Sequence, residues 1–420
     1  MSAAPPISKA ALIPGIALVA ASKLLIRAGV ARRTDGWRRA AGLVLRGEES
    51  TFVLSAFGLD AWSDGPSQRS ADLHCAQSHV AARLAAQLRG EPAAHIRVTK
   101  GEFEDRIETT SGPAYTLAHD PWVEGPGRFV PPTAWNGETA TALPPNATPL
   151  VNFVCRISHD GECDVWARFN HVGIDGVPAQ AILTRLESTW GVPRSVHFPS
   201  TQSFAPFTIP RTCPGRPDLG EVQTFLNFEP LLKWRKGQNA HLPEPMTVGA
   251  ALLWRMAHHE VFRGLHAGST VEVPEVQGIP AGVGVVVIRA SDYTDKPDGL
   301  ARFVKDFNRQ IERTRSRASP SMRTLDAAAR IPASLAANLI RFGLSSDPRA
   351  FGEVALTMLR DAKVFGAPLA DTGHTRGFLA IGNAALPTVE GGCVACVSAK
   401  GPVSTIAQYP RVLEDVLRDL

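Results

Sequence analysis

The feature that most constrains this fold is a pair of alternating apolar segments followed directly by a helix signal. Apolar residues occupy every second position in residues 151–157 and again in 163–169, and the His-Asp-Gly-Glu stretch between them is typical of a tight turn. Pro178 then opens a segment whose apolar residues share one helical face. These residues are Ala179, Ile182, Leu183, Leu186 and Trp190. The pattern predicts a β-hairpin, a short loop and a helix.

The end of the chain repeats this order. Two strand-like segments, 378–386 and 391–399, precede a short loop and a helix that Pro410 opens. The repetition indicates two related lobes. The predicted fold class is α/β, an α+β sandwich, in which each lobe is a mixed β-sheet covered by helices and the lobes face one another across a cleft.

Proline content marks a boundary between the two halves. Residues 196–220 contain five prolines and no sustained periodicity. Because proline cannot donate in a sheet ladder and disrupts helix interiors, we expect a semi-rigid connector there. The predicted domains are an N-terminal lobe over 1–205, a Pro-rich connector over 206–222 and a C-terminal lobe over 223–420. Further amphipathic segments predict helices over 76–89, 248–261 and 300–311.

Composition excludes several classes of protein. Of the 420 residues, 44% are hydrophobic and 20% are charged, and the net charge is +4. These values are typical of a soluble globular protein, and the small, dispersed positive charge argues against nucleic-acid binding. The longest apolar stretch, from Ala11 to Ser22, is interrupted by Pro14 and is shorter than the roughly 20 residues that span a bilayer. No transmembrane segment is expected.

The N-terminus and the cysteines bear on location. The residues before Asp35 include five basic side chains and no acidic one, which fits either a docked N-terminal helix from Pro14 to Gly29 or an organelle-targeting or membrane-surface segment. Helix start and stop signals favour the docked helix.

Six cysteines are too sparse for a disulfide scaffold, so we expect buried thiols, a reducing compartment and a cytoplasmic location.

Other groupings of chemistry-bearing residues do not fit known site patterns. Cys393 and Cys396 lie three apart on a predicted strand, where they point to opposite faces, and no second pair follows. His74, Cys75 and His79 lack a fourth ligand at the usual spacing. No metal site is therefore expected. Neither a Gly-x-Ser-x-Gly nor a Walker sequence occurs, which excludes the commonest hydrolase and NTPase signatures.

The best candidate for chemistry is His171. It lies where the second strand of the hairpin leaves the sheet, and Asp175-Gly176 closes a tight loop before the helix. An imidazole is mostly neutral at pH 7 and can accept a proton, which suits general-base work. Gly176 permits a backbone conformation or a close approach that a side chain would block. A histidine at a strand end is more often structural, but strand, loop glycine and helix together favour catalysis.

The His-x-x-x-Asp-Gly pattern in this context resembles the signature of the CoA-dependent acyltransferase superfamily. Its members include chloramphenicol acetyltransferase, the acyltransferase cores of 2-oxoacid dehydrogenase complexes, carnitine acyltransferases, plant-type alcohol acyltransferases and peptide-synthetase condensation domains. The pattern lies in the first half of a 420-residue chain. That position is similar to the two-lobed, monomeric members. The resemblance implies two chloramphenicol acetyltransferase-like lobes with an active-site tunnel between them.

The resemblance also implies a role for each matching residue. His171 matches the catalytic histidine, which deprotonates an acceptor hydroxyl, thiol or amine for attack on a thioester carbonyl. Asp175 matches an aspartate that points away from the substrate and holds the loop through an arginine. Gly176 matches the glycine of the turn. Candidate partners of Asp175 are Arg27, Arg32, Arg33 and Arg168.

The chain departs from the family pattern at several points. Asn170 stands where many members have a second histidine, and the Asp-Phe-Gly-Trp-Gly signature of the plant-type enzymes is absent. Where the dehydrogenase cores have Ile-Ser-Asn, this chain has Ile381-Gly382-Asn383. The hydroxyl that contacts the oxyanion is therefore missing. The Asn383 amide, or a backbone N–H, is the candidate replacement donor.

Two functions follow from these residues. The first is acyl transfer from a CoA or carrier-protein thioester to a hydroxyl, amine or thiol of a small-molecule acceptor, without a permanently bound cofactor. A monomer, with an acyl carrier protein as a further partner, fits this function. The second, motivated by Gly382 and Asn170, is a catalytically degenerate acyltransferase fold that acts as a binding or scaffold module.

Overall fold

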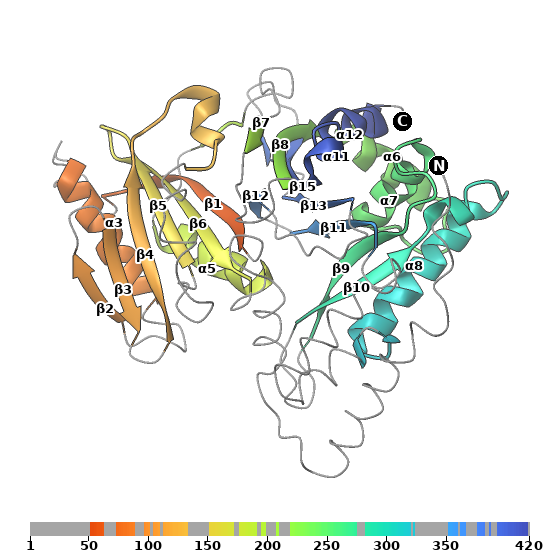
Figure 1. The fold of residues 1–420 in the computed structure, drawn as a ribbon, viewed down its shortest axis with the longest axis horizontal. Helices are drawn as coiled ribbons and strands as arrows, with labels where there is room; N and C mark the ends of the chain where they lie inside the picture. Colours follow the sequence, from red (N-terminus) through yellow and green to blue (C-terminus); the bar gives the residue numbers. More distant parts are fainter. Residues whose placement is uncertain are drawn as a thin grey trace, which may run out of the picture.

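Two mixed β-sheets with helices packed against them make up the molecule (Figure 1). The computed structural model describes residues 51–62, 73–88, 96–100, 104–109, 112–132, 151–171, 176–190, 195–198, 207–209, 219–274, 282–320, 322–323, 352–359, 362–366, 376–382, 386–387 and 393–418. Expectations that fall elsewhere, including those for the N-terminal segment, Asp175 and Asn383, lie outside the described residues.

The N-terminal sheet has the strand order β12-β1-β6-β5-β4-β3-β2. Its strands are β1 (Thr51–Asp60), β2 (Ile96–Lys100), β3 (Glu104–Thr109), β4 (Gly112–Asp120), β5 (Val151–Ile157), β6 (Glu162–Asn170) and β12 (Lys363–Gly366). β4 and β5 run parallel, and the other neighbours run antiparallel. The predicted hairpin is confirmed, because β5 and β6 pair with Phe153 opposite Ala167.

Two helices cover one face of this sheet. α3 (Leu73–Leu88) and α5 (Gly176–Thr189) pack on β5 and β1 respectively. The alternating apolar residues of the hairpin all point to these helices. The strands therefore have an apolar repeat of 2 residues, whereas the helix that follows has one of 3.6. The resulting core includes Phe153, Phe169, Leu84 and Leu186, all buried.

The C-terminal sheet has the order β10-β9-β11-β13-β15-β8-β7, with β14 paired to β15. Its strands are β7 (Phe207–Ile209), β8 (Leu219–Asn227), β9 (Ala267–Val273), β10 (Gly282–Ile288), β11 (Val354–Met358), β13 (Gly377–Ile381), β14 (Leu386–Pro387) and β15 (Cys393–Pro402). β11 runs parallel to both β9 and β13. The mixed sheets and their helices confirm the predicted fold class.

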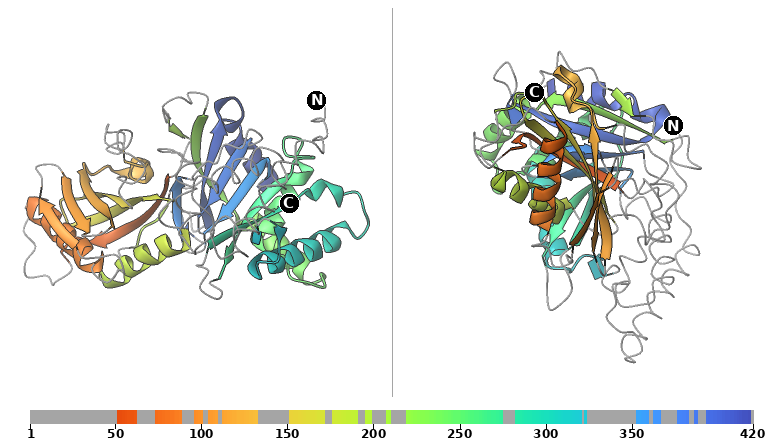
Figure 2. Two further views of the ribbon diagram at one scale, coloured as in Figure 1. Left: turned by 60° about the horizontal axis from the view of Figure 1, so that its bottom comes forward. Right: turned by 90° about the vertical axis from the view of Figure 1, so that its left-hand side faces the viewer.

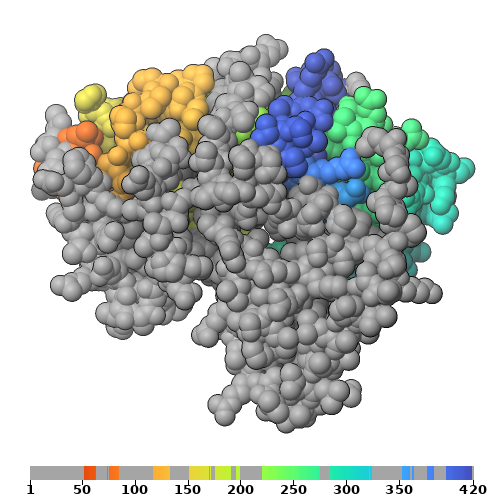
Figure 3. All heavy atoms as spheres, viewed as in Figure 1, coloured from red at the N-terminus to blue at the C-terminus, as the bar shows by residue number. Residues whose placement is uncertain are grey.

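Helices cover the outer face of the C-terminal sheet. They are α6 (Glu229–Asn239), α7 (Val248–His258), α8 (Gly299–Arg315), α11 (Val403–Ile406) and α12 (Tyr409–Arg418), with the short 3₁₀ helix η5 (Ala290–Asp292) before α8. Figure 3 shows the C-terminal residues, in blue, beside the green residues that include α6 and α7. The Thr247 side chain accepts from Ala250 N at 3.1 Å and so caps α7. In the described part of the chain, no helix is long and apolar enough to cross a bilayer.

One strand connects the two halves. β12 comes from the second half of the chain but pairs antiparallel with β1, opposite Val53, Leu54 and Ser55, and it also lies beside β15, β13 and β8 of the other sheet (Figure 2). The Lys363 ammonium of β12 donates to Glu187 of α5 at 2.8 Å. β7 and the start of β8 lie within 206–222, the predicted connector. The predicted domain limits remain a prediction.

A third apolar cluster, the junction core, lies between the two sheets. β1, β5 and β6 contribute one side of it, and β8 and β15 the other. Its members are Val53, Phe57, Phe129, Val154, Trp166, Phe198, Phe225, Val394 and Cys396. The ring centroids of Phe129 and Phe225 lie 6.1 Å apart in a T-shaped contact. Aromatic packing therefore joins the lobes.

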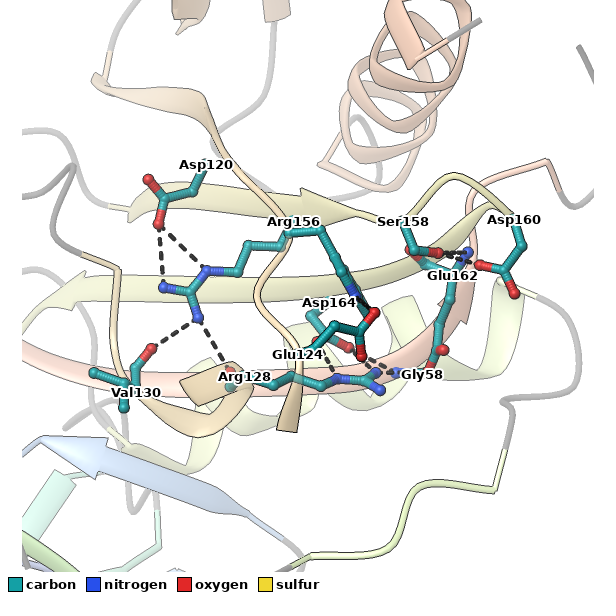
Figure 4. Close-up of polar contacts among 11 residues, drawn as sticks. Gly58, Asp120, Glu124, Arg128, Val130, Arg156, Ser158, Asp160, Glu162 and Asp164 are labelled. Carbon is teal, nitrogen blue, oxygen red and sulfur yellow. Dashed lines mark hydrogen bonds and ion pairs between the residues drawn. The ribbon is translucent and has the colours of Figure 1, made fainter. Parts of the chain in front are cut away.

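Ion pairs fasten the segment that carries Phe129 (Figure 4). This segment includes the 3₁₀ helix η3 (Gly125–Phe129). The Arg128 guanidinium donates to both oxygens of Asp164 on β6 and, at 2.6 Å, to Glu162. Arg156 of β5 donates to the carbonyls of Arg128 and Val130 and pairs with Asp120. The segment is thus held against the sheet, and Phe129 is held in the junction core.

The cysteine side chains that the structure describes follow the prediction of buried thiols in three of four cases. Cys155, Cys163 and Cys396 are free and buried, and Cys75 is free and exposed. A hydrogen bond with Cys155, together with burial, raises the pKa of the Cys163 thiol well above its usual value. Burial likewise raises the pKa of Cys396. These protonated thiols are poor nucleophiles and poor metal ligands.

The Asp164 network makes a prediction for stability. The Asp164 side chain is fully buried and also accepts from the backbone N–H of Gly58 at 3.0 Å. Asp164→Ala removes that acceptor and leaves Arg128 with Glu162 alone, so we expect the free energy of unfolding in urea to fall by about 3 kcal/mol. Glu414→Gln, which removes an exposed ion pair with Arg418 on α12, is the control and should cost below about 0.5 kcal/mol. Equal losses in the two variants would contradict the assignment.

Candidate active site

His171 lies directly after β6, as predicted. β6 ends at Asn170, and the His171 side chain is partly exposed. The neighbouring strand β1 begins beside this point, with Phe52 opposite Phe169 in register. The Phe52 ring stacks on Phe169 at 5.4 Å between centroids and meets the His171 ring in a T-shaped contact at 5.3 Å. One side of the imidazole is therefore packed against an aromatic ring that the sheet fixes.

The described elements before and after the motif are both fixed in the N-terminal lobe. On one side β6 pairs with both β1 and β5. On the other side α5 begins at Gly176, slightly before Pro178, and buries Ala179, Ile182, Leu183 and Leu186 in the N-terminal core. Residues 172–175, among them Asp175, lie outside the described residues. The predicted strand and helix are thus the two rigid elements on either side of the motif, and the strand ends directly before His171.

Gly176 is in close contact with the other half of the chain. A Cβ at this position would lie 2.9 Å from Cδ2 and 3.1 Å from Cδ1 of Leu359, which follows the end of β11. Leu359 itself packs against the N-terminal core. The contact is consistent with one of the two predicted reasons for glycine, a close approach, and the group that approaches is Leu359. The role of Gly176 in the motif stays a prediction.

Leu359 also connects this loop to β13. Its backbone N–H donates to the carbonyl of Ile381 at 3.1 Å, and Ile381 is the last residue of β13. The chain then passes through Ala362, which is fully buried in the N-terminal core, into β12. A single segment of the second half therefore contacts both the motif glycine and the strand end at which the sequence predicts an oxyanion donor.

Gly382 has no free backbone donor at this strand end. Its N–H donates to the carbonyl of Cys396 at 3.0 Å, so it serves the sheet instead of an oxyanion. Asn383, the next residue and the predicted donor, lies outside the described residues. Its assignment stays a prediction.

The arginine partner of Asp175 is likewise a prediction. Of the four candidates, Arg27, Arg32 and Arg33 lie outside the described residues. Arg168 lies on β6 opposite Val53 and is 6% exposed. It shares a strand face with Trp166 of the junction core, because side chains two apart on a strand point the same way.

Sequence reasoning missed the groups that make long-range contacts. Leu359 and Lys363 connect the second half of the chain to α5, and Arg128 pairs with Asp164 within the first lobe; no local pattern marks any of them. Within the described ranges, no three His, Cys, Asp or Glu side chains are grouped so that they could hold a metal ion. His79 instead contacts the Trp62 ring at 5.6 Å.

Comparisons with known proteins identify the fold. No family model matches the sequence. No curated protein matches it either. The structure is similar to that of TRI3, the trichothecene 15-O-acetyltransferase from Fusarium sporotrichioides, with 10% sequence identity, a TM-score of 0.52 and coverage of 92% of this chain and 94% of that one. It is also similar to the starter condensation domain of rhizomide synthetase RzmA, solved with C8-CoA and Leu-SNAC, with 12% identity, a TM-score of 0.50 and the same coverage.

The chain has the two-lobed chloramphenicol acetyltransferase-like fold. Both solved structures match it over nearly their whole length, so the likeness includes both lobes. At this level of identity the likeness establishes the fold alone. What a chloramphenicol acetyltransferase-like protein with these side chains does must be argued from its site.

The contact between Gly176 and Leu359 makes a second prediction. Gly176→Ala forces the terminal methyl groups of Leu359 to move, and because these end a flexible, partly buried side chain we expect a loss of about 1 kcal/mol in the free energy of unfolding. In a Leu359→Ala background the same change should cost much less, because the obstructing methyl groups are gone. Additive losses in this double-mutant cycle, measured by urea unfolding, would mean that the contact does not constrain the loop.

Gly237→Ala is the matched control for this cycle. Gly237 lies in α6, and a Cβ there would meet nothing within 4 Å. Replacing a helical glycine with alanine at an open position stabilises a protein by about 0.5–1 kcal/mol. The change in the free energy of unfolding should thus have opposite signs at the two glycines, which distinguishes a steric conflict from an effect of helix propensity.

Proposed function

We propose that this protein is an acyltransferase that moves an acyl group from a CoA or carrier-protein thioester to a hydroxyl, amine or thiol of a small-molecule acceptor. The observation that carries the proposal is the position of His171, at the end of a central strand and before a glycine that the second lobe contacts. The chloramphenicol acetyltransferase-like fold supports it, since the two solved structures are an acetyltransferase and a condensation domain. Catalytic histidines need such rigid support.

In the proposed reaction, the His171 imidazole removes the proton from the acceptor as its oxygen, nitrogen or sulfur attacks the thioester carbonyl. A tetrahedral intermediate forms, and its negative oxygen requires a hydrogen-bond donor. When the carbon–sulfur bond breaks, the imidazolium returns the proton to the leaving thiolate. The products are the acylated acceptor and a free thiol, and the histidine ends neutral. No permanently bound cofactor takes part.

The remaining roles follow the sequence resemblance. Asn383 donates its side-chain amide to the oxyanion, a role consistent with the use of the Gly382 N–H in the sheet. Asp175 orients the loop through an arginine and takes no part in the chemistry. The substrates enter a tunnel between the lobes of a monomer, and a carrier protein delivers the donor where CoA does not. The buried thiols of Cys155, Cys163 and Cys396 are consistent with action in the cytoplasm.

A second function is a binding or scaffold module that has lost catalysis. Two observations favour it: glycine at 382 provides no hydroxyl, and its N–H is already bonded to Cys396. Calorimetric titration with acetyl-CoA, followed by a search for free thiol release across a panel of acceptors, separates the two functions. Binding without thiol release would support the scaffold.

His171→Ala tests the proposed role of the histidine. Loss of a general base lowers the rate by roughly 10²–10⁴-fold, so we expect kcat for thiol release to fall by that factor while the melting temperature changes little. His79→Ala is the matched control, because His79 also makes a T-shaped contact with an aromatic ring but lies on α3. Undiminished turnover in His171→Ala would contradict the assignment.

Asp175→Asn tests whether Asp175 has a structural role while His171 carries out the catalysis. If Asp175 holds the loop through a buried arginine, breaking the pair should lower the free energy of unfolding by about 3–5 kcal/mol and should lower activity with it. Thermal melting and turnover are measured on the same preparation. A variant that melts like the parent yet has no activity would show that the carboxylate acts in the chemistry itself.

A further inference from the structure

A band of buried polar side chains extends from the junction core along the C-terminal sheet. Phe225 of β8 lies opposite Cys396 of β15, and both belong to the junction core. Two residues further along each strand, and therefore on the same face, Gln223 lies opposite Ser398. Both are fully buried, at 0% exposure. This face of the sheet points toward the N-terminal lobe, because Phe225 and Cys396 pack there against β1 and β6.

The next pair along the same face is charged. Glu221 lies opposite Lys400, and both side chains are buried. Opposite charges at directly paired positions on neighbouring strands compensate one another. These four residues, Glu221, Gln223, Ser398 and Lys400, form what we call the polar band. Its formal charges sum to zero, so it favours an uncharged ligand over an ion.

Within the described part of the chain, Ser398 Oγ and Gln223 Oε1 of the polar band have no hydrogen-bond partner. The amide nitrogen of Gln223 does have a partner, since Nε2 donates to Cys396 Sγ at 3.0 Å. That bond fixes the direction of the amide and leaves Oε1 as an acceptor without a donor.

The facing sheet supplies a third such oxygen. Ser55 of β1 lies between Val53 and Phe57, both members of the junction core. Its side chain is 3% exposed, and among the residues that the structure describes its Oγ also has no hydrogen-bond partner. Buried polar groups are nearly always hydrogen-bonded, and each exception calls for an explanation such as a bound water or a ligand. Three exceptions on the facing surfaces of two lobes suggest one common explanation.

We propose that the polar band and Ser55 recognise the acceptor substrate, and that this acceptor is an uncharged molecule carrying a hydroxyl or amide N–H in addition to its reacting group. Gln223 Oε1 can only accept a hydrogen bond, so the ligand must donate one. The serine hydroxyls at Ser398 and Ser55 can donate or accept. The inference rests on the proposed function for the identity of the ligand as an acceptor, and on the buried oxygens for its chemistry.

The first test measures stability without ligand. Ser398→Ala and Gln223→Met replace groups that have unpaired oxygens, so we expect the melting temperature of each variant to stay unchanged or to rise by about 2 °C. Thr270→Val is the matched control, because Thr270 Oγ1 donates to Thr357 Oγ1 at 2.8 Å between neighbouring strands. The control should melt about 2–4 °C lower. If Ser398→Ala and Gln223→Met melt lower as well, ordered water satisfies these groups and the inference is overturned.

The second test measures recognition by thermal shift on the full chain. The probes are matched fragment pairs such as hexan-1-ol with hexane-1,6-diol, and cyclohexanol with 4-hydroxycyclohexane carboxamide. We expect the member with the extra donor to stabilise the wild type at least twofold more than its partner. The Ser398→Ala/Gln223→Met variant should bind it about tenfold more weakly and should lose the preference. No preference in the wild type, or the same preference in the variant, overturns the inference.

Thiol release from acetyl-CoA, measured in parallel, keeps the two proposals apart. If fragments with the extra hydrogen-bond donor bind more tightly but no thiol is released, the proposed function is contradicted and the recognition site is still supported. Thiol release with an unchanged acceptor preference in the double variant would support the proposed function and contradict the recognition site.

Discussion

The pairing of β12 with β1 is the interaction on which the rest of this structure depends. β1 carries Phe52, which contacts the ring of His171, and its inner neighbour β6 ends directly before that histidine. Without β12, the hydrogen-bonding groups on the open side of β1 would face the other lobe unpaired. With it, Leu359 and Ala362 are drawn into the N-terminal core. The candidate site is thus built by both halves of the chain, although His171 belongs to one.

Buried polar and charged side chains have two different roles in this protein. At η3 the groups saturate one another: Asp164 accepts from Arg128 and Gly58, and Arg156 donates to two carbonyls and to Asp120. Such a network fixes a segment in one place and has little capacity left for a ligand. In the polar band the balance differs, because Gln223 and Ser398 retain acceptor capacity. The distinction separates structural polar groups from those available for recognition.

Local patterns predicted the local structure well. The alternation at 151–157 and 163–169 predicted the hairpin, and the helical faces predicted α5 and α8, because periodicity reports directly on which side of an element is buried. For Gly176 the sequence left open a special backbone conformation or a close approach, and the structure has Leu359 in close contact with it. The groups that sequence reasoning could not find, Leu359, β12 and the Arg128–Asp164 pair, depend on contacts between distant segments. A four-residue strand has too few positions to show alternation.

The crossover by β12 has a consequence for folding. The N-terminal sheet cannot be completed until residues 363–366 have been synthesised, so its last pairing has a very large sequence separation. Contacts of this kind slow folding, because a long loop must close before they form. On the ribosome, the first lobe would wait with β1 as an exposed edge until the second lobe is nearly finished. The first lobe therefore cannot be transferred between proteins as an independent module, since the second half of the chain carries a strand of its sheet.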